Sequence, residues 1–373
     1  MKVKYYRPDI FQLDNLEDVP HIVSLGGFVQ ANPPVDRTGN FNPFNMTYDP
    51  IPKVVKFNKS WEECCMDAAK ELWQLGKPIE LFWSGGIDSS GVLIALLETK
   101  SDSDVLNIRY TQDSIDEFPL MWEKMVKGKN NPLSHKEMLD DSLFENHNII
   151  KVTGECGDQC FGSYGGSAAL SENTDKNTDD WESIFTWPNG KLFYRNSDGP
   201  KDSQENYEHK KMRLAEILFE HVDYSPVEIK TIFDLFWWCN FCFKWQDADS
   251  RIIFAYSGTP EWKSTISFFN TEDFQKWSIV NHDIKHGGTW ATYKQPAKDY
   301  INKYIKDETY RKNKTKEPSL VKIFVGAADG QYNYKYRKKW RETPSRIKLV
   351  LDDGRFWRKD EKVPDEIYKD III

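Results

Sequence analysis

The sequence has no run of apolar residues long enough to cross a membrane, which takes roughly 18 in succession. Its most aromatic stretch, "IFDLFWWCNFCFKW" at residues 232–245, is too short and holds Asp234, Asn240 and Lys244. The first residues, "MKVKYYRPDIFQLDN", lack the apolar core of a signal peptide. We therefore expect a cytoplasmic protein without a membrane segment.

An excess of positive charge is also missing. Lysine and arginine number 50 and aspartate and glutamate 58, so the formal net charge is −8. Proteins that bind nucleic acids in general need a positive surface to face the phosphate backbone. General nucleic-acid binding is therefore not expected. The length of 373 residues suits one large domain with additions, or two domains.

Cysteine is scarce as well. Six cysteines in a chain of this size do not look like a disulfide scaffold. They fall in three pairs: Cys64 and Cys65, Cys156 and Cys160, Cys239 and Cys242. The CxxC spacing of the last pair is typical of zinc and redox sites, but aromatic residues surround it. We interpret the cysteines as reduced core thiols.

The order of predicted elements indicates an α/β protein. Residues 1–58 are rich in turn formers and predict an irregular N-terminal arm with short strands. Ser60, with Glu63 three residues later, predicts a capped helix that Gly76 and Pro78 end. Strands are then predicted at 79–83, 104–111 and 148–154, and helices at 89–98, 116–126 and 134–146. Such alternation predicts a doubly wound parallel sheet, with ligands at the carboxyl ends of the strands.

The second half of the chain is less regular. Residues 171–206 are polar and predict a long variable loop, and helical additions are expected at 207–316. Asp353-Gly354, between two short apolar runs, predicts a hairpin within a β-rich C-terminal extension at 319–373. The main domain is therefore placed at 59–318.

One predicted strand-to-helix loop, "SGGIDSS" at residues 84–90, has the composition of a phosphate site. It has neither the lysine of a GxxxxGK[ST] loop nor the GxGxxG spacing of a dinucleotide fold. It does offer backbone N–H groups, hydroxyls and a helix N-terminus. Asp88 would repel phosphates unless a divalent cation lay between them, so it indicates Mg²⁺. The plainer interpretation of Asp88, a helix cap, does not require two glycines.

Two motifs carry a resemblance to a known family. "SGGIDSS" resembles the pyrophosphate-binding loop of the PP-loop ATP pyrophosphatases, and "VTGECGDQCFGS" at 152–163 resembles the asparagine synthetase motif SGEGSDExFGGY. Members of this family cleave ATP to AMP and pyrophosphate and form an adenylated substrate that a nitrogen or sulfur nucleophile attacks. The resemblance implies an asparagine synthase-like, ATP-dependent carbon–nitrogen ligase that uses ATP and Mg²⁺. Its substrates would be a small carboxylate and ammonia or an amine.

The resemblance also implies roles for individual residues. Glu155 matches the acidic residue that transfers or orients a proton, and Asp88 and Asp158 match the Mg²⁺-binding aspartates. Lys294, in "TYKQPAKDYINKYIKDETYRKNK", matches the catalytic lysine, and Lys298 stands in place of an arginine. The ATP-binding residues implied are Trp83, Ser84, Gly85, Gly86, Asp88, Ser89, Ser90, Ile108, Thr153, Gly154 and Lys298.

The sequence departs from the family pattern at several points. Cys156 stands where glycine is usual, and Gln159 replaces a common glutamate. Position 2 is Lys2 rather than the cysteine of a glutaminase, and only about 78 residues precede the loop. We therefore expect no N-terminal glutaminase domain, and free ammonia, an amine, or ammonia from a separate glutaminase subunit as the nitrogen source. Neither the acid nor the oligomeric state is predicted.

Two other classes of function stay open. A nucleobase- or tRNA-thiolating enzyme uses the same loop, and Cys239 with Cys242 could serve it. A degenerate nucleotide-binding domain used for assembly is suggested by Cys156, by Gln159 and by the missing glutaminase.

Overall fold

The structure is a computed structural model, and it describes residues 2–6, 34–41, 45–54, 56–135, 148–162, 180–185, 204–256, 264–285, 292–314, 347–358 and 361–367. Most of the predicted helix at 134–146 and most of the predicted loop at 171–206 lie outside these residues.

A five-stranded parallel sheet forms the centre of the fold, in the order β4-β3-β2-β5-β6. Its strands are β2 (Ile79–Phe82), β3 (Leu106–Tyr110), β4 (Pro132–Ser134), β5 (Ile150–Thr153) and β6 (Thr265–Ser267). Every residue of β2 and of β5 is buried, as in sheets covered by other elements. From β2 the chain adds β3 and β4 on one side and then returns to add β5 and β6 on the other. The order therefore reverses between β2 and β5, which is where ligands bind in open parallel sheets.

Three of the five strands agree with the sequence-based prediction, and two do not. β2, β3 and β5 are confirmed within one to two residues at most ends. β4 occupies Ser134, where a helix was predicted to begin, and β6 lies within the region predicted to be helical. Both have three residues, too few for an alternating apolar pattern to be recognised.

The helices next to the sheet follow local signals. α2 (Trp61–Trp73) begins at Ser60, whose side chain and that of Glu63 form the predicted capping box. α3 (Ile87–Thr99) follows β2. The helix predicted at 116–126 is divided into α4 (Gln112–Glu117), α5 (Pro119–Met121) and a π-helical turn (Trp122–Val126). The break is at Phe118, because the residue before a proline disfavours the helical conformation.

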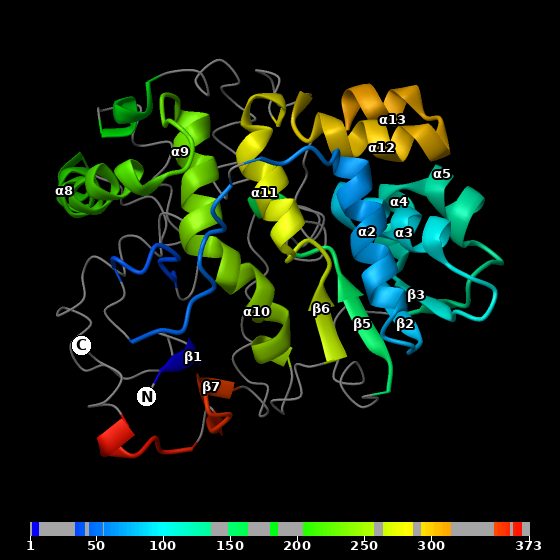
Figure 1. Ribbon diagram of the computed structural model, residues 1–373, viewed down its shortest axis with the longest axis horizontal. Helices are drawn as coiled ribbons and strands as arrows, with labels where there is room; N and C mark the ends of the chain where they lie inside the picture. The colour runs from blue at the N-terminus through cyan, green and yellow to red at the C-terminus, as the bar shows by residue number, and fades with distance from the viewer. Residues whose placement is uncertain are drawn as a thin grey trace.

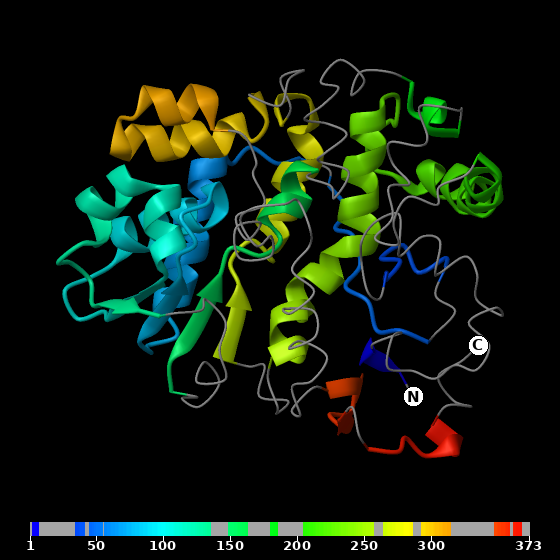
Figure 2. The same cartoon turned by 180° about the vertical axis from the view of Figure 1, so that it is seen from behind.

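Seven further helices complete the described part of the fold. They are α6 (Gly157–Phe161), α8 (Gln204–His221), α9 (Ile232–Cys239), α10 (Trp245–Tyr256), α11 (Glu272–Val280), α12 (Gln295–Ile305) and α13 (Glu308–Asn313). Figures 1 and 2 show α8, α9 and α10 on the β6 side, and α12 and α13 above α3, α4 and α5. Among the described residues, no helix has both the length and the apolar composition needed to cross a membrane.

A second, antiparallel sheet joins the two ends of the chain. It has the order β1-β7-β8, from β1 (Val3–Tyr6), β7 (Ile347–Leu351) and β8 (Phe356–Arg358). The predicted hairpin at Asp353-Gly354 is confirmed, and Gly354 has the positive φ of 89° that the turn needs. The sequence analysis did not predict that β1 of the N-terminal arm would pair with the C-terminal extension.

Arg37 anchors the N-terminal arm in the helical part of the molecule. It is 1% exposed and donates to the carbonyl oxygen of Phe241 at 2.9 Å, to that of Asp49 at 2.8 Å, and to the Gln275 side chain. Its backbone N–H donates to the carbonyl oxygen of Cys242. Phe241 and Cys242 belong to a π-helical turn (Asn240–Lys244), so the arm supplies donors to carbonyls in an irregular helical turn.

We expect Arg37→Met to lower the free energy of unfolding by about 3 kcal/mol or more, because it leaves several buried acceptors without a donor, at roughly 1–3 kcal/mol each. Urea denaturation followed by tryptophan fluorescence measures this loss. Arg355→Met is the control, since Arg355 is exposed and pairs with Asp353 at the surface, and its midpoint should stay at the wild-type value. Equal midpoints for the two variants would contradict an anchoring role for Arg37.

Candidate functional site

The two motif loops meet at the reversal point of the sheet. The loop at 84–86 joins β2 to α3, and the loop at 154–156 joins β5 to α6. A Cβ atom on Gly157 would lie 2.6 Å from Oδ1 of Asp88, and one on Gly154 would lie 3.0 Å from the backbone nitrogen of Ser89. Only a residue without a side chain fits at Gly157. The structure therefore places in direct contact two loops that the sequence analysis identified separately.

The first loop is shaped by its own side chains. The Ser89 hydroxyl accepts from the Ser84 backbone N–H at 3.1 Å and bonds the Ser84 hydroxyl at 3.0 Å. Gly85 has a φ of 77°, and a side chain there would collide with the carbonyl oxygen of Ser114. Nε1 of Trp83 donates to the Ser90 hydroxyl at 3.2 Å, and both residues are fully buried. Trp83 and Ser90 thus support the loop from within the core.

The centre of the site is an ion triad of Asp88, Asp158 and Lys294. Nζ of Lys294 lies 2.5 and 2.6 Å from the two carboxylate oxygens of Asp88 and 2.6 Å from Oδ1 of Asp158. The lysine side chain is 2% exposed, whereas those of Asp88 and Asp158 are 21% and 33% exposed. Burial alone would lower the pKa of Lys294, but attraction to Asp158 and Asp88 outweighs it and raises this pKa. Lys294 therefore carries a positive charge at the base of an accessible acidic site.

Two residues of the site, one of them in the triad, have a strained backbone. Lys294 has a φ of 56° and Cys156 a φ of 68°, in the left-handed region that side chains other than glycine rarely adopt. Lys294 is the N-cap of α12, and Cys156 is the N-cap of α6. Glycine, which is usual at this position in the family that the motif resembles, would hold this conformation without strain. Strain of this kind concentrates at functional sites, where neighbouring structure compensates for it.

The two carboxylates match the needs of Mg²⁺ bound together with phosphates. Mg²⁺ takes oxygen ligands, commonly one or two carboxylates with the remainder from water and substrate phosphates. Asp88 and Asp158 supply two carboxylates that face the same point and remain partly accessible. Within the part of the chain that the structure describes, no group of three or more His, Cys, Asp or Glu side chains gathers for a metal. Asp88 and Asp158 therefore fit a Mg²⁺ ion whose remaining ligands are water and the phosphates of a substrate.

Three other predicted site residues lie in two different parts of the fold: Thr153 and Glu155 in the second loop, and Ile108 in the sheet. Thr153 ends β5, and its hydroxyl accepts from the backbone N–H of Glu155 at 3.4 Å, so both belong to the second loop. Ile108 lies in the middle of β3, with its side chain in the core and its backbone N–H donated to the carbonyl oxygen of Asn131. Ile108 therefore lies within the sheet, two residues before the end of β3, and not in either loop.

Lys298 lies one helical turn beyond Lys294, and its backbone N–H donates to the Lys294 carbonyl. Its side chain is buried, and Nζ donates to the carbonyl oxygen of Lys314 at 3.3 Å. Burial lowers the pKa of Lys298 from 10.5 to about 8.

This pKa predicts a dependence of stability on pH. Between pH 8 and 10.5 the unfolded chain holds a proton on Lys298 that the folded protein has lost, so the free energy of unfolding rises with pH across that window. The contribution is at most about 3 kcal/mol. Urea denaturation from pH 7 to 10.5 should give a steeper rise for the wild type than for Lys298→Met. Parallel curves for the two proteins would contradict the shift.

Sequence reasoning missed Asp249 of α10. Its carboxylate accepts hydrogen bonds from the side chains of Ser267 and Asn270, and Ser267 pairs with Thr153 at the ends of β6 and β5. Burial raises the pKa of Asp249 despite these bonds. The aspartate stands in "KWQDADS", within a helical stretch rich in aromatic residues, which gave no local sign of a site.

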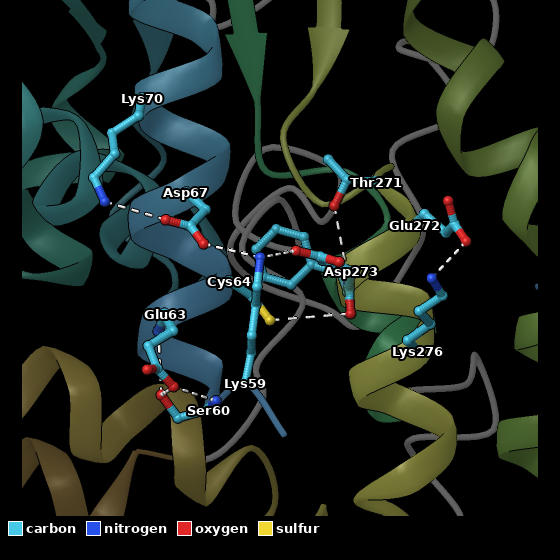
Figure 3. Close-up of polar contacts among 11 residues, drawn as sticks. Lys59, Ser60, Glu63, Cys64, Asp67, Lys70, Thr271, Glu272, Asp273 and Lys276 are labelled. Atoms are coloured by element: carbon cyan, nitrogen blue, oxygen red, sulfur yellow. Dashed lines mark hydrogen bonds and ion pairs between the residues drawn. The ribbon is translucent and has the colours of Figure 1, made fainter. Parts of the chain in front are cut away.

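Lys59 forms two ion pairs that link α2 to the start of α11, just after β6 (Figure 3). Nζ of Lys59 lies 2.9 Å from the Asp67 carboxylate and 2.6 Å from that of Asp273, at the start of α11. Phe269 lies just before α11, and its ring would be 3.0 Å from a Cβ atom on Gly157. The ion pairs of Lys59 therefore help to position Phe269 against Gly157, next to Asp158.

All six cysteines are reduced and buried, as the sequence analysis expected. Burial raises the pKa of each thiol, so none is poised as a thiolate. Sγ of Cys242 donates to the Asp36 carboxylate at 3.3 Å in the core. This arrangement does not favour sulfur transfer by the CxxC pair.

Compared with known proteins, the chain matches no protein-family model and no curated protein.

Proposed function

We propose that the protein is an asparagine synthase-like, ATP-dependent amide-forming ligase on a doubly wound PP-loop fold. One observation carries this proposal: two aspartates and a lysine from the N-terminal ends of three helices, α3, α6 and α12, converge where the order of the parallel strands reverses. A buried cation between two accessible carboxylates suits a substrate that brings both phosphate charge and a metal.

In this proposal the phosphates of ATP lie over the loop at 84–90, against its backbone N–H groups and the N-terminus of α3. Asp88 and Asp158 would hold Mg²⁺, which lowers the negative charge on the pyrophosphate leaving group when bound. The Lys294 ammonium donates to phosphate oxygens and stabilises the charge that builds up there.

The reaction has two displacements. A carboxylate oxygen of the substrate attacks the α-phosphorus of ATP, the bond to the β-phosphate oxygen breaks, and pyrophosphate leaves. Ammonia or an amine then attacks the acyl carbon of the adenylate, and AMP leaves with the electrons of the acyl–oxygen bond. Glu155 accepts the proton that the nitrogen loses.

The test is a product analysis. The protein is incubated with ATP, MgCl2, ammonia and a panel of carboxylic acids, and nucleotides and pyrophosphate are quantified for each acid. AMP and pyrophosphate in equal amounts, dependent on one acid, support the proposal; dependence on aspartate would identify asparagine formation. Release of ADP and phosphate, AMP formation that needs a tRNA and a sulfur donor, or ATP binding without cleavage would each contradict it.

A further inference from the structure

Lys285 is a buried amine that the proposed reaction does not use. It follows a 3₁₀ turn (His282–Ile284) after α11, and it is 0% exposed. Among the described residues, no carboxylate forms an ion pair with it. Burial holds the pKa of Lys285 well below its usual value, because the charged form loses the water that would solvate it. A methionine of similar length would fill the same space without this cost, so the amine calls for a role.

The Lys285 side chain ends in a buried chain of hydrogen bonds. Nζ lies 2.9 Å from Nδ1 of His282, and Nε2 of His282 lies 2.7 Å from Oδ1 of Asp234 in α9. Because an ionised carboxylate only accepts, Nε2 carries the proton of the ring and Nδ1 accepts from Lys285. The other oxygen of Asp234 accepts from the backbone N–H groups of Lys230 and Thr231. The chain therefore ties Lys285 to the N-terminus of α9.

Trp237 of α9 packs against the same amine and also contacts α6 through a hydroxyl. Nζ of Lys285 lies 3.8 Å from the centroid of the Trp237 ring. Nε1 of this ring donates to the Ser278 hydroxyl at 2.9 Å, and the hydroxyl donates to the carbonyl oxygen of Cys160 at 2.7 Å. Cys160 belongs to α6, two residues after Asp158. Trp237 thus supports both Lys285 and the helix that carries Asp158.

The backbone of Lys285 contacts Lys294 of the ion triad directly. The backbone N–H of Lys294 donates to the Lys285 carbonyl oxygen at 3.2 Å. Lys294 has the strained φ of 56°, and its Nζ contacts both Asp88 and Asp158. A strained backbone persists only where the surrounding structure fixes it. A shift of Lys285 would therefore move Lys294.

We propose that Lys285 is a positioning residue that holds Lys294 in place against Asp158. Its side chain, anchored by His282 and Trp237, fixes its own carbonyl oxygen, and this oxygen fixes the backbone of Lys294. The same tryptophan supports α6, so Lys294 and Asp158 share one buried support. The inference rests on the proposed function, because it takes Lys294 as the residue that donates to phosphate oxygens. It extends that function to a buried chain of residues that touches no substrate.

The first test compares Lys285→Met with the wild type in steady-state AMP formation, with the acid that supports the reaction. The value of kcat should fall roughly 10–100-fold, because a displacement of about 1 Å far from the chemistry can cost about 10²-fold. KM for ATP should stay near the wild-type value, since Lys294 acts on charge that develops during the reaction. The midpoint of urea denaturation should not fall, because a buried amine without a counter-charge is removed. A lower midpoint with an unchanged kcat would overturn the proposal.

A double variant tests whether Lys285 acts through Lys294. If it does, Lys285→Met combined with Lys294→Met should form AMP no more slowly than Lys294→Met alone, whereas losses that multiply would overturn the proposal. MgCl2 without nucleotide gives a readout that needs no turnover. A displaced Lys294 leaves Asp88 and Asp158 free for the ion, so MgCl2 should raise the melting temperature of Lys285→Met more than that of the wild type.

Two substitutions of His282 test the hydrogen bond from Lys285. His282→Phe keeps a ring against Trp237 but removes the acceptor, so it should repeat the loss of kcat. His282→Asn keeps an oxygen that can accept from Lys285, so it should retain most of the wild-type rate. Lys276→Met is the matched control, since Lys276 is a lysine of α11 that pairs with the exposed Glu272 (Figure 3). It should keep the wild-type kcat.

The outcomes separate the inference from the proposed function. Wild-type protein that forms AMP, together with Lys285→Met and His282→Phe variants of unchanged kcat, overturns the positioning role and leaves the proposed function standing. Wild-type protein that forms no AMP with any acid overturns the proposed function. In that case the response to MgCl2 decides the positioning role alone, and a Lys285→Met protein that responds as the wild type does overturns it as well.

Discussion

Asp88→Asn should reduce the release of AMP and pyrophosphate by about 10³-fold or more. The substitution removes one of the two carboxylates available to Mg²⁺ and also one of the two that neutralise Lys294. Loss of a single preorganised electrostatic contact costs roughly 10²–10³-fold in turnover, and here two are lost. The fold should survive, because Asp88 lies in the first turn of α3 while Gly86 is its N-cap. Steady-state release of pyrophosphate, with circular dichroism as a check of folding, measures the effect.

Asp353→Asn is the matched control for this experiment. Asp353 also forms an ion pair, with Arg355, but it lies in the exposed turn between β7 and β8 of the second sheet. Its variant should keep the turnover of the wild type. If Asp88→Asn also kept wild-type turnover, the carboxylate would have no part in the reaction and the proposed function would fail.

Lys294→Met should lower both turnover and stability. Without the ammonium, Asp88 and Asp158 face one another across a site in which Lys294 itself is 2% exposed. Removing one partner of a buried ion pair costs about 3–5 kcal/mol, because the opposite charges remain without compensation. Turnover should fall by roughly 10²–10³-fold, since the charge that stabilises the phosphate oxygens is lost. Urea denaturation and initial rates of AMP formation measure the two losses.

The same variant tests whether the two aspartates form a metal site. With the competing ammonium gone, MgCl2 alone should raise the melting temperature of Lys294→Met more than that of the wild type. Lys303→Met is the control, since Lys303 is an exposed residue of the same helix that pairs with Glu62. It should respond to MgCl2 as the wild type does. A Lys294→Met protein with unchanged stability and no response to Mg²⁺ would mean that the carboxylates do not act as a pair.

Much of the central sheet and of the candidate site could be predicted because its signals are local. The Ser60–Glu63 capping box, the apolar run of β2 and the Asp353-Gly354 turn each lie within a few residues, and each forms as expected. The loop at 84–90 is likewise recognisable in the sequence from its two glycines, its serine hydroxyls and one aspartate. Local periodicity and turn chemistry act over a single turn or strand, so a sequence displays them directly.

Tertiary structure alone decided which distant residues meet. Lys294 reaches Asp88 across 206 residues and Asp158 across 136. β1 pairs with β7 from the other end of the chain, and Arg37 bonds a helical turn 204 residues away. Strands β4 and β6 exist because neighbouring strands pair with their short segments, although three residues carry too weak a pattern of their own. In the same way the buried Asp249 carboxylate acquires significance only from Ser267 and Asn270, which donate to it. Such contacts depend on strand order and side-chain packing, which a single sequence without aligned relatives does not encode in any local pattern.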